Sequence, residues 1–236
     1  MSPTIITSNN FDSSNVSFSE LRKNKMGGKV VYISNAATTK KLVMQLPKMR
    51  APFGLSRFDD QNSGKSTFSL DLSLDGREEF RAALEGLDDK IVKLVAANSK
   101  AWLGKVHSAT VVRDVLYKPI VKLPQDSKYA PTIKLKVMVD SNGNFIPEAY
   151  DSKSKKISFD ALEKGQHMRA IVHVSQVWII DNKCGVSLRL EQVMTSPTDK
   201  IRGFAFQPDG EEDAPATEES EKEEEDEEEE EEFVDE

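Results

Sequence analysis

The sequence predicts a mainly β protein in which one main helix is inserted between strands and a disordered acidic tail follows. Residues 66–74 (STFSLDLSL) alternate between apolar and polar side chains, which is typical of a strand with one buried face. In residues 77–98 apolar side chains recur every three to four positions, which indicates an amphipathic helix. Residues 211–236 contain 18 acidic residues and one lysine, so they have too little apolar surface to fold.

Shorter β-type runs complete the predicted sheet at 30–34, 41–46 and 110–123. Two hairpins are expected, one around Asn142-Gly143 and one around Asp181-Asn182-Lys183, because such residues favour tight turns. This order suits an oligonucleotide-binding (OB) fold, a five-stranded Greek-key barrel, with extra strands. Other all-β barrels or sandwiches fit the same pattern. We expect a flexible N-terminal arm (1–27), an OB-fold domain (28–200) and a linker with the acidic tail (201–236).

Charge is divided unevenly along the chain. The whole sequence has 40 acidic and 32 basic residues, a net charge of −8. Residues 1–210 alone have 22 acidic and 31 basic residues, a net charge of +9. A basic body attracts polyanions, and a chain of carboxylates imitates a chain of phosphates. We therefore predict a nucleic-acid-binding body whose tail competes for the same surface. A tail that only increases solubility is the alternative.

Several classes of protein are disfavoured. The single cysteine, Cys184, excludes a disulfide framework, and without a long apolar run or signal peptide we expect a soluble intracellular protein that does not contact membranes. The segment Gly64–Thr67 (GKST) looks like the end of a phosphate loop, but Asp59 stands where that loop needs glycine. His167 and His173 would lie about 20 Å apart on a strand, too far to share a metal. We expect no enzyme, no cofactor and no metal site.

Binding of an unpaired strand needs cations for the phosphates and flat rings for the bases. Three stretches combine the two: 48–58 (KMRAPFGLSRF), 100–105 (KAWLGK) and 117–136. Core packing is the competing interpretation of the aromatic residues, and any solvated strand could present Lys134 and Lys136. Trp178, inside QVWII, is assigned to the core. The predicted DNA-binding residues are Lys48, Arg50, Phe53, Arg57, Phe58, Lys100, Trp102, Lys105, Lys118, Lys122, Lys128, Tyr129, Lys134 and Lys136.

Four features resemble the single-stranded-DNA-binding proteins of T7-type phages and their counterparts in large nucleocytoplasmic DNA viruses. They are KMRAPFGLSRF, the SLDLSL strand followed by a helix, KYAPTIKLKV, and the acidic tail with Phe233 near its end. The resemblance covers residues 40–236, and APFGLS and KYAPTIKLK look closest to the large-virus branch. In the phage branch the aromatic residue is the last one, whereas here three residues follow Phe233.

The resemblance implies an OB-fold dimer that coats unwound DNA without strong sequence preference. Replication, recombination and repair of viral DNA, in the host nucleus or a cytoplasmic replication site, are the implied setting. The tail, through Phe233, would bind replication proteins such as polymerase and helicase/primase. A chaperone for histones or other basic proteins, with the tail as its working part, is the alternative, although it leaves the basic body unexplained. A nuclease or strand-annealing accessory lacks a visible catalytic set.

Overall fold

The computed structural model describes residues 4–24, 27–61, 64–197 and 204–207. The chain divides into two units, Met1–Thr198 and Asp199–Glu236, and the first holds every described helix and strand. The predicted tail, residues 211–236 with Phe233, lies outside the described residues.

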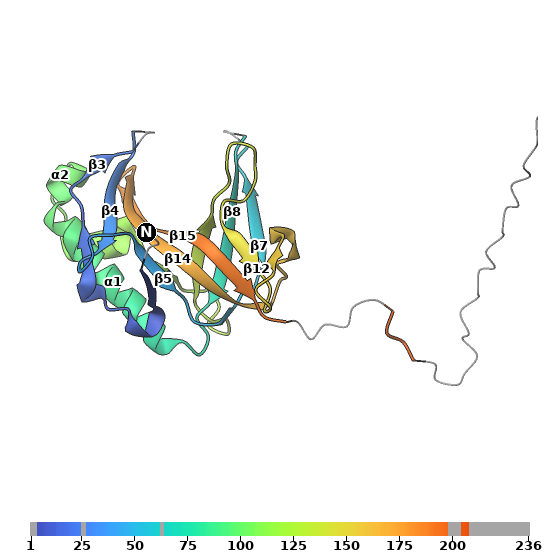
Figure 1. Cartoon of the computed structure of the whole chain (residues 1–236). Helices are drawn as coiled ribbons and strands as arrows, with labels where there is room; N and C mark the ends of the chain where they lie inside the picture. Colours follow the sequence, from blue (N-terminus) through green and yellow to red (C-terminus); the bar gives the residue numbers. More distant parts are fainter. Residues whose placement is uncertain (1–3, 25–26, 62–63, 198–203, 208–236) are drawn as a thin grey trace, which may run out of the picture. The chain divides into compact units, whose positions relative to one another are not determined.

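A closed barrel with OB topology forms the centre of the first unit. Its first strand is a bent stretch of chain that contains β5, β6 and β7, and the remaining four are β8, β11, β14 and β15. All neighbours are antiparallel except β11 and β15, which run parallel. Because β7 pairs with β8 while β5 and β6 pair with β14, the bent first strand closes the ring and confirms the OB-fold. The bounds are β5 (Leu42–Gln45), β6 (Met49–Arg50), β7 (Leu55–Asp59), β8 (Ser66–Ser73), β11 (Thr132–Val137), β14 (His167–Ile180) and β15 (Lys183–Thr195), drawn in Figure 1.

Short strands extend this barrel. β4 continues the sheet along the second half of β14, β9 and β12 run parallel to β15, and β10 pairs with β11. The bounds are β1 (Ile5–Thr7), β2 (Val16–Phe18), β3 (Arg22–Lys23), β4 (Lys29–Asn35), β9 (Tyr117–Lys118), β10 (Val121–Lys122), β12 (Glu148–Tyr150) and β13 (Lys156–Ile157).

The N-terminal residues correct the expectation of a loose arm. β1 lies parallel to β5, and β2 and β3 pair with β4. Phe11 and Val16 are buried in the main core. The ammonium of Lys90 donates hydrogen bonds of 2.7–3.0 Å to the backbone carbonyls of Ser13, Ser14 and Val16. A sequence rich in Ser and Asn is held here because a few apolar side chains and one half-buried cation fix it to the body.

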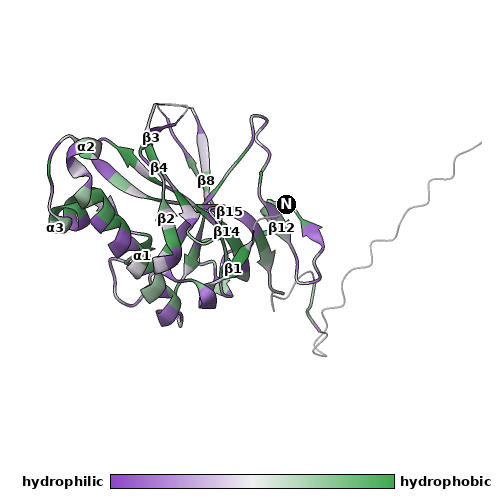
Figure 2. Ribbon diagram, turned by 60° about the vertical axis from the view of Figure 1, so that its left-hand side comes forward, coloured by the Kyte–Doolittle hydropathy of each residue, from purple (hydrophilic) through white to green (hydrophobic). Residues whose placement is uncertain are grey.

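The main helix is α1 (Glu78–Ala97), as the apolar period predicts. Phe80, Leu84, Leu87 and Ile91 are buried on one face, while Glu78 and other charged residues remain exposed. Figure 1 shows α1 and α2 (Ser99–Leu103) on the side of the first unit that is away from β7 and β8. In Figure 2 they carry both hydrophobic and hydrophilic residues, as amphipathic elements do.

Residues 109–116 are helical, although the sequence predicts a β-rich segment from 110 to 123. Ser108 starts α3 (Ala109–Val111) by accepting a hydrogen bond from the Val111 amide, and a π-helical turn, Val112–Leu116, follows. Only residues after 116 join the sheet, as β9 and β10. Among the helices that the structure describes, none has the length and apolarity needed to cross a membrane.

Candidate nucleic-acid interface

The outer face of β8 and β11 forms the floor of an open groove. Along β11 the side chains of Ile133 and Leu135 point into the barrel, so Lys134 and Lys136 point outward. The cross-strand partner of Lys134 is Asp71, whose Oδ2 lies 3.8 Å from the ammonium. In OB-folds the face of the second and third strands is the one that binds oligonucleotides. Here those strands are β8 and β11.

We call this hollow of about 860 Å³ the sheet groove. Its walls come from the segment that contains β9 and β10, from the turn between β14 and β15, and from the exposed ring of Phe58 on β7. The lining residues that carry charge or rings are Phe58, Phe68, Lys118, Lys122, Lys134, Lys136, Trp178, Asp181 and Lys183.

Trp178 belongs to this groove, which corrects its assignment to the core. It is half-buried and lies opposite Gly185 in the β14–β15 ladder. The absence of a side chain at Gly185 lets the indole lie against the sheet: an added Cβ would come within 2.6 Å of Trp178 Cζ2. The ammonium of Lys118 lies 5.9 Å from the ring centroid. The site therefore offers an aromatic face framed by a cation.

A β-bulge in β14 explains why Trp178 faces outward. Before the bulge, even-numbered residues such as Val172 and Val174 point into the barrel. The ladder shifts register between Val174 and Gln176, and from there odd-numbered residues such as Val177 and Ile179 point inward. Trp178 consequently moves to the outer face. Nothing in the alternation of QVWII could reveal this single extra residue.

A second hollow of about 800 Å³, here called the end groove, lies beside the sheet groove. Lys122 lines both, so the two hollows adjoin at this side chain, and we refer to them together as the joined grooves. Phe53 and Tyr129 in the end groove are 58% and 61% exposed, and Lys128 lies 4.9 Å from the Tyr129 ring. The charged or aromatic lining residues are Lys48, Arg50, Phe53, Asp75, Arg77, Lys122, Lys128, Tyr129, Lys164 and His167.

The joined grooves are strongly cationic. Their described lining contains ten lysines and arginines against two acids, Asp75 and Asp181. The pKa of the Lys122 ammonium is lowered, mainly because the group is partly buried. The positive charges of Lys134 and Lys118 nearby lower it further. Like charges placed so close together repel one another, and an anionic chain in the groove relieves that repulsion. The arrangement suits a flexible polyanion that also carries flat rings.

Ten of the fourteen predicted residues line these grooves, and four do not. Trp102 is only 7% exposed and packs in the core from α2 (Ser99–Leu103). Lys100 and Lys105 flank it on the surface, but neither lines the grooves. Arg57 points to the face of β7 opposite Phe58 and pairs with Asp59 at 2.8 Å. The prediction that KAWLGK presents an aromatic ring to DNA is wrong, because residues 99–103 form a helix that turns the Trp102 side chain into the core.

The groove also contains residues that the sequence reasoning missed. They are Phe68, Arg77, Lys164, Trp178 and Lys183. Arg77 and Lys164 come from loops far apart in sequence, so no local pattern of cations and rings marks them. Lys183 stands in the predicted turn between β14 and β15, and its place beside an OB-fold sheet was the one available signal.

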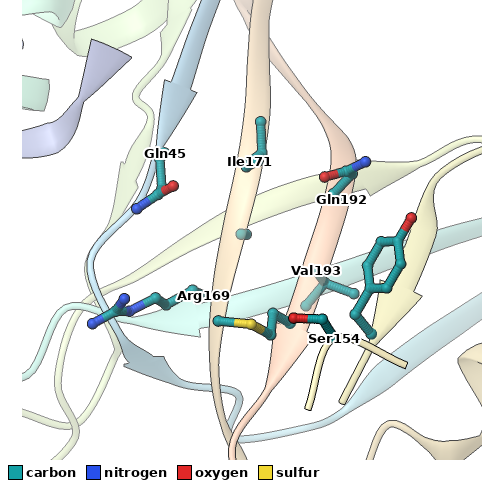
Figure 3. A pocket seen from close by; sticks show the side chains of 9 residues that line it. Gln45, Ser154, Arg169, Ile171, Gln192 and Val193 are labelled. Carbon is teal, nitrogen blue, oxygen red and sulfur yellow. The ribbon is translucent and has the colours of Figure 1, made fainter. Parts of the chain in front are cut away.

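A separate cavity of about 300 Å³ lies against β5, β14 and β15. Figure 3 shows Gln45 and Gln192 on either side of Ile171, with Arg169 below them. One cation among these polar and aliphatic side chains gives far less charge than the joined grooves. We therefore do not assign the nucleic-acid interface to it.

Comparisons with known proteins give distant similarities. No protein-family model matches the chain. The uncharacterized protein L291 of Acanthamoeba polyphaga mimivirus is 24% identical over 164 residues, which are 65% of this chain and 26% of that protein. The chain thus spans about a quarter of the length of this relative.

Two solved structures of phage proteins show a distant similarity in fold to this chain. The single-stranded DNA-binding protein from bacteriophage Enc34, in complex with ssDNA, has a TM-score of 0.41 and 12% identity, over 78% of this chain and 97% of that chain. The gp2.5 protein, a single-stranded DNA-binding protein encoded by bacteriophage T7, has a TM-score of 0.42 and 16% identity, over 70% of this chain and 91% of that chain.

Proposed function

We propose that this protein binds single-stranded DNA along the joined grooves, without strong sequence preference. The observation that supports this most directly is the combination of ten cations with exposed rings along the β8–β11 face of an OB-fold and in the end groove beside it. Lysines neutralise phosphates and release counterions, while each stacked base contributes about 1–3 kcal/mol. Every base has a ring face, so stacking tolerates any sequence.

Single strands fit these grooves better than duplexes do. Phe53, Phe58 and Tyr129 are all more than half exposed, and Trp178 presents its indole in the sheet groove. A duplex hides the faces of its bases inside the stack, so these rings would have no exposed base to stack on. An unpaired strand can turn its bases toward the protein while its phosphates meet the lysines.

The acidic tail adds a regulatory part to the proposal. We propose that residues 211–236 compete with DNA for the grooves, and that DNA binding frees the tail for replication proteins such as polymerase and helicase/primase. Phe233 would then contribute an apolar contact. Coating of viral DNA during replication, recombination and repair by a homodimer, without any catalytic step, completes the proposed role.

A titration of fluorescent oligo-dT tests the binding proposal. The double variant Lys134→Ala/Lys136→Ala should weaken binding at least tenfold at low salt. It should also reduce the slope of log Kd against log salt by about 1.4, since each phosphate contact on a single strand contributes about 0.7. The matched control, Lys40→Ala/Lys93→Ala, removes two exposed lysines that do not line the grooves. Equal effects of the two pairs would refute the proposed site.

Titration with the same fluorescent oligo-dT distinguishes single-strand binding from the chaperone alternative. A chaperone whose working part is the tail would bind histones through residues 211–236, and its body alone would not bind oligo-dT. We expect the opposite, namely that the truncated chain 1–210 binds the oligonucleotide, and does so more tightly than the full chain. Incubation of labelled DNA with the protein and Mg²⁺ should leave the DNA uncut, whereas cleavage would indicate a nuclease.

A further inference from the structure

The segment from Tyr117 to Lys122 is attached to helix α1 by one buried carboxylate. Asp88 Oδ1 accepts a 2.5 Å hydrogen bond from the Tyr117 hydroxyl. The same carboxylate accepts the backbone N–H of Ile120, at 3.1 Å through Oδ2 and 3.3 Å through Oδ1. Asp88 thus holds both ends of the Tyr117–Ile120 stretch. Lys118 lies inside that stretch and Lys122 just beyond it, and both line the sheet groove.

The backbone of this segment makes few other hydrogen bonds, although Tyr117, Ile120 and Val121 are buried in the core. β9 and β10 contain two residues each, and Pro119 between them has no N–H to donate. β9 pairs with β15 and β10 with β11, but each pairing covers only two residues. The Ile120 amide, which stands at the bend, finds its acceptor in Asp88. Without that acceptor the bend would lose the hydrogen bonds that fix its distance from α1.

The surroundings of Asp88 favour an anchoring role over an electrostatic one. The residue is 5% exposed, and no described cation pairs with it. Arg113, the nearby guanidinium, bonds Asp89 at 2.7 Å instead. Burial of this carboxylate, more than any other influence, raises its pKa to about 6. An unpaired buried acid is unfavourable, and its hydrogen bonds to the lysine-bearing segment are the visible compensation.

We propose that Asp88 is a positioning residue for DNA binding, which holds Lys118 and Lys122 at the groove through its bonds to Tyr117 and Ile120. This inference rests on the proposed function. Asp88 itself does not line either groove. It acts from the opposite side of the segment, so that packing of helix α1 sets the place of two groove lysines.

Three substitutions in the full chain separate this anchor from a charge effect. Asp88→Ala removes the acceptor and should weaken oligo-dT binding about five- to tenfold, with a salt slope lower by about 1.4 for two lost lysine contacts. Asp88→Asn keeps a carbonyl acceptor of the same shape and should stay within twofold of wild type. Asp89→Ala removes the same charge from the neighbouring position and should bind as tightly as wild type, or more tightly.

The sign of the effect makes the test decisive. Removal of a negative charge near a DNA groove should by charge alone strengthen binding, so a loss in Asp88→Ala requires a structural cause. Equal or tighter binding by Asp88→Ala overturns the inference, and so does an Asn variant as weak as the Ala variant. If the wild type itself fails to bind oligo-dT, the proposed function fails, and not the anchor alone.

Thermal unfolding measures whether each variant folds. If Asp88→Ala does not fold, Tyr117→Phe tests the anchoring role of Asp88 in its place. This variant removes one of the hydrogen bonds and leaves Asp88 and its bond to the Ile120 amide in place. We expect Tyr117→Phe to bind oligo-dT about two- to threefold more weakly while its far-UV spectrum is unchanged. Binding equal to that of wild type would overturn the inference.

Discussion

The indole of Trp178 lies against the backbone of Gly185, its direct partner across the β14–β15 ladder. A Cβ added to Gly185 would meet Trp178 Cζ2 at 2.6 Å, Cε2 at 3.0 Å and the Lys118 carbonyl oxygen at 3.1 Å. This small residue therefore holds the aromatic ring of the sheet groove in place. One glycine in the fifth strand of the barrel sets the position of a side chain in the fourth.

Gly185→Ala should consequently displace the Trp178 ring. We expect oligo-dT binding to weaken about three- to tenfold, since the ring loses its stacking position. Gly86→Ala in α1 is the control: its Cβ would lie 3.4 Å from Ser13 Oγ, an ordinary contact, and alanine stabilises a helix. Oligonucleotide titrations of both variants check this. Unaltered binding by Gly185→Ala would show that the ring does not stack on bases where it now lies.

The two tryptophans should behave differently when each is truncated. Trp102→Ala removes a core ring and should destabilise the fold by about 3–5 kcal/mol in urea unfolding. Trp178→Ala should leave the unfolding midpoint almost unchanged and weaken oligo-dT binding by about 1–3 kcal/mol. Since the chain has only two tryptophans, Trp102→Phe leaves Trp178 as the sole indole emitter. Its fluorescence should be quenched by oligo-dT, and a flat titration would contradict the assignment.

Removal of the acidic tail should tighten DNA binding. Truncation after residue 210 removes 18 acids and one lysine and leaves a chain of net charge +9. If the tail competes for the grooves, the gain should be largest at low salt and shrink as ions screen the charges. Filter binding or anisotropy at two salt concentrations measures it. A salt-independent affinity ratio near one would refute the competition.

The pH dependence of stability should contain a contribution from His173. Burial, followed by the charges of Lys41 and Arg189, lowers the pKa of this imidazole to about 4. Glu191 Oε1 lies 3.7 Å from Nδ1, too far for a hydrogen bond, so it does not offset burial. The folded state favours the neutral ring, and the free energy of unfolding should fall as pH drops from about 6.5 to about 4.

Chemical unfolding of His173→Gln across this pH range checks the expectation. Glutamine cannot take up a proton, so the variant should lose part of the acid-induced destabilisation between pH 6.5 and 4. An acid slope identical to that of wild type would assign the effect to other groups.

Local periodicity was enough for the elements that carry most of the core. The alternation of residues 66–74 gave β8, with Leu70, Leu72 and Leu74 all buried. The three-to-four period of residues 77–98 gave α1. The turn at Asp181-Asn182 was also predicted correctly, because both residues adopt the left-handed backbone that a two-residue hairpin needs. Each of these signals depends only on residues close together in sequence.

The interface depended on contacts between distant parts of the chain. A bulge in β14 turned Trp178 outward, α2 turned Trp102 inward, and the N-terminal strands attached to β4 and β5. These outcomes depend on which strand pairs with which, and a shift of one residue reverses every face.

By itself the sequence determined the mainly β class, the inserted helix, the basic body of residues 1–210 and the acidic composition of residues 211–236. Only the tertiary structure decided which cations and rings share one groove. Composition and period are properties of neighbouring residues, whereas the joined grooves bring together side chains from Lys48 to Lys183. Their meeting follows from the parallel pairing of β11 with β15 and from barrel closure, which no short stretch of sequence encodes.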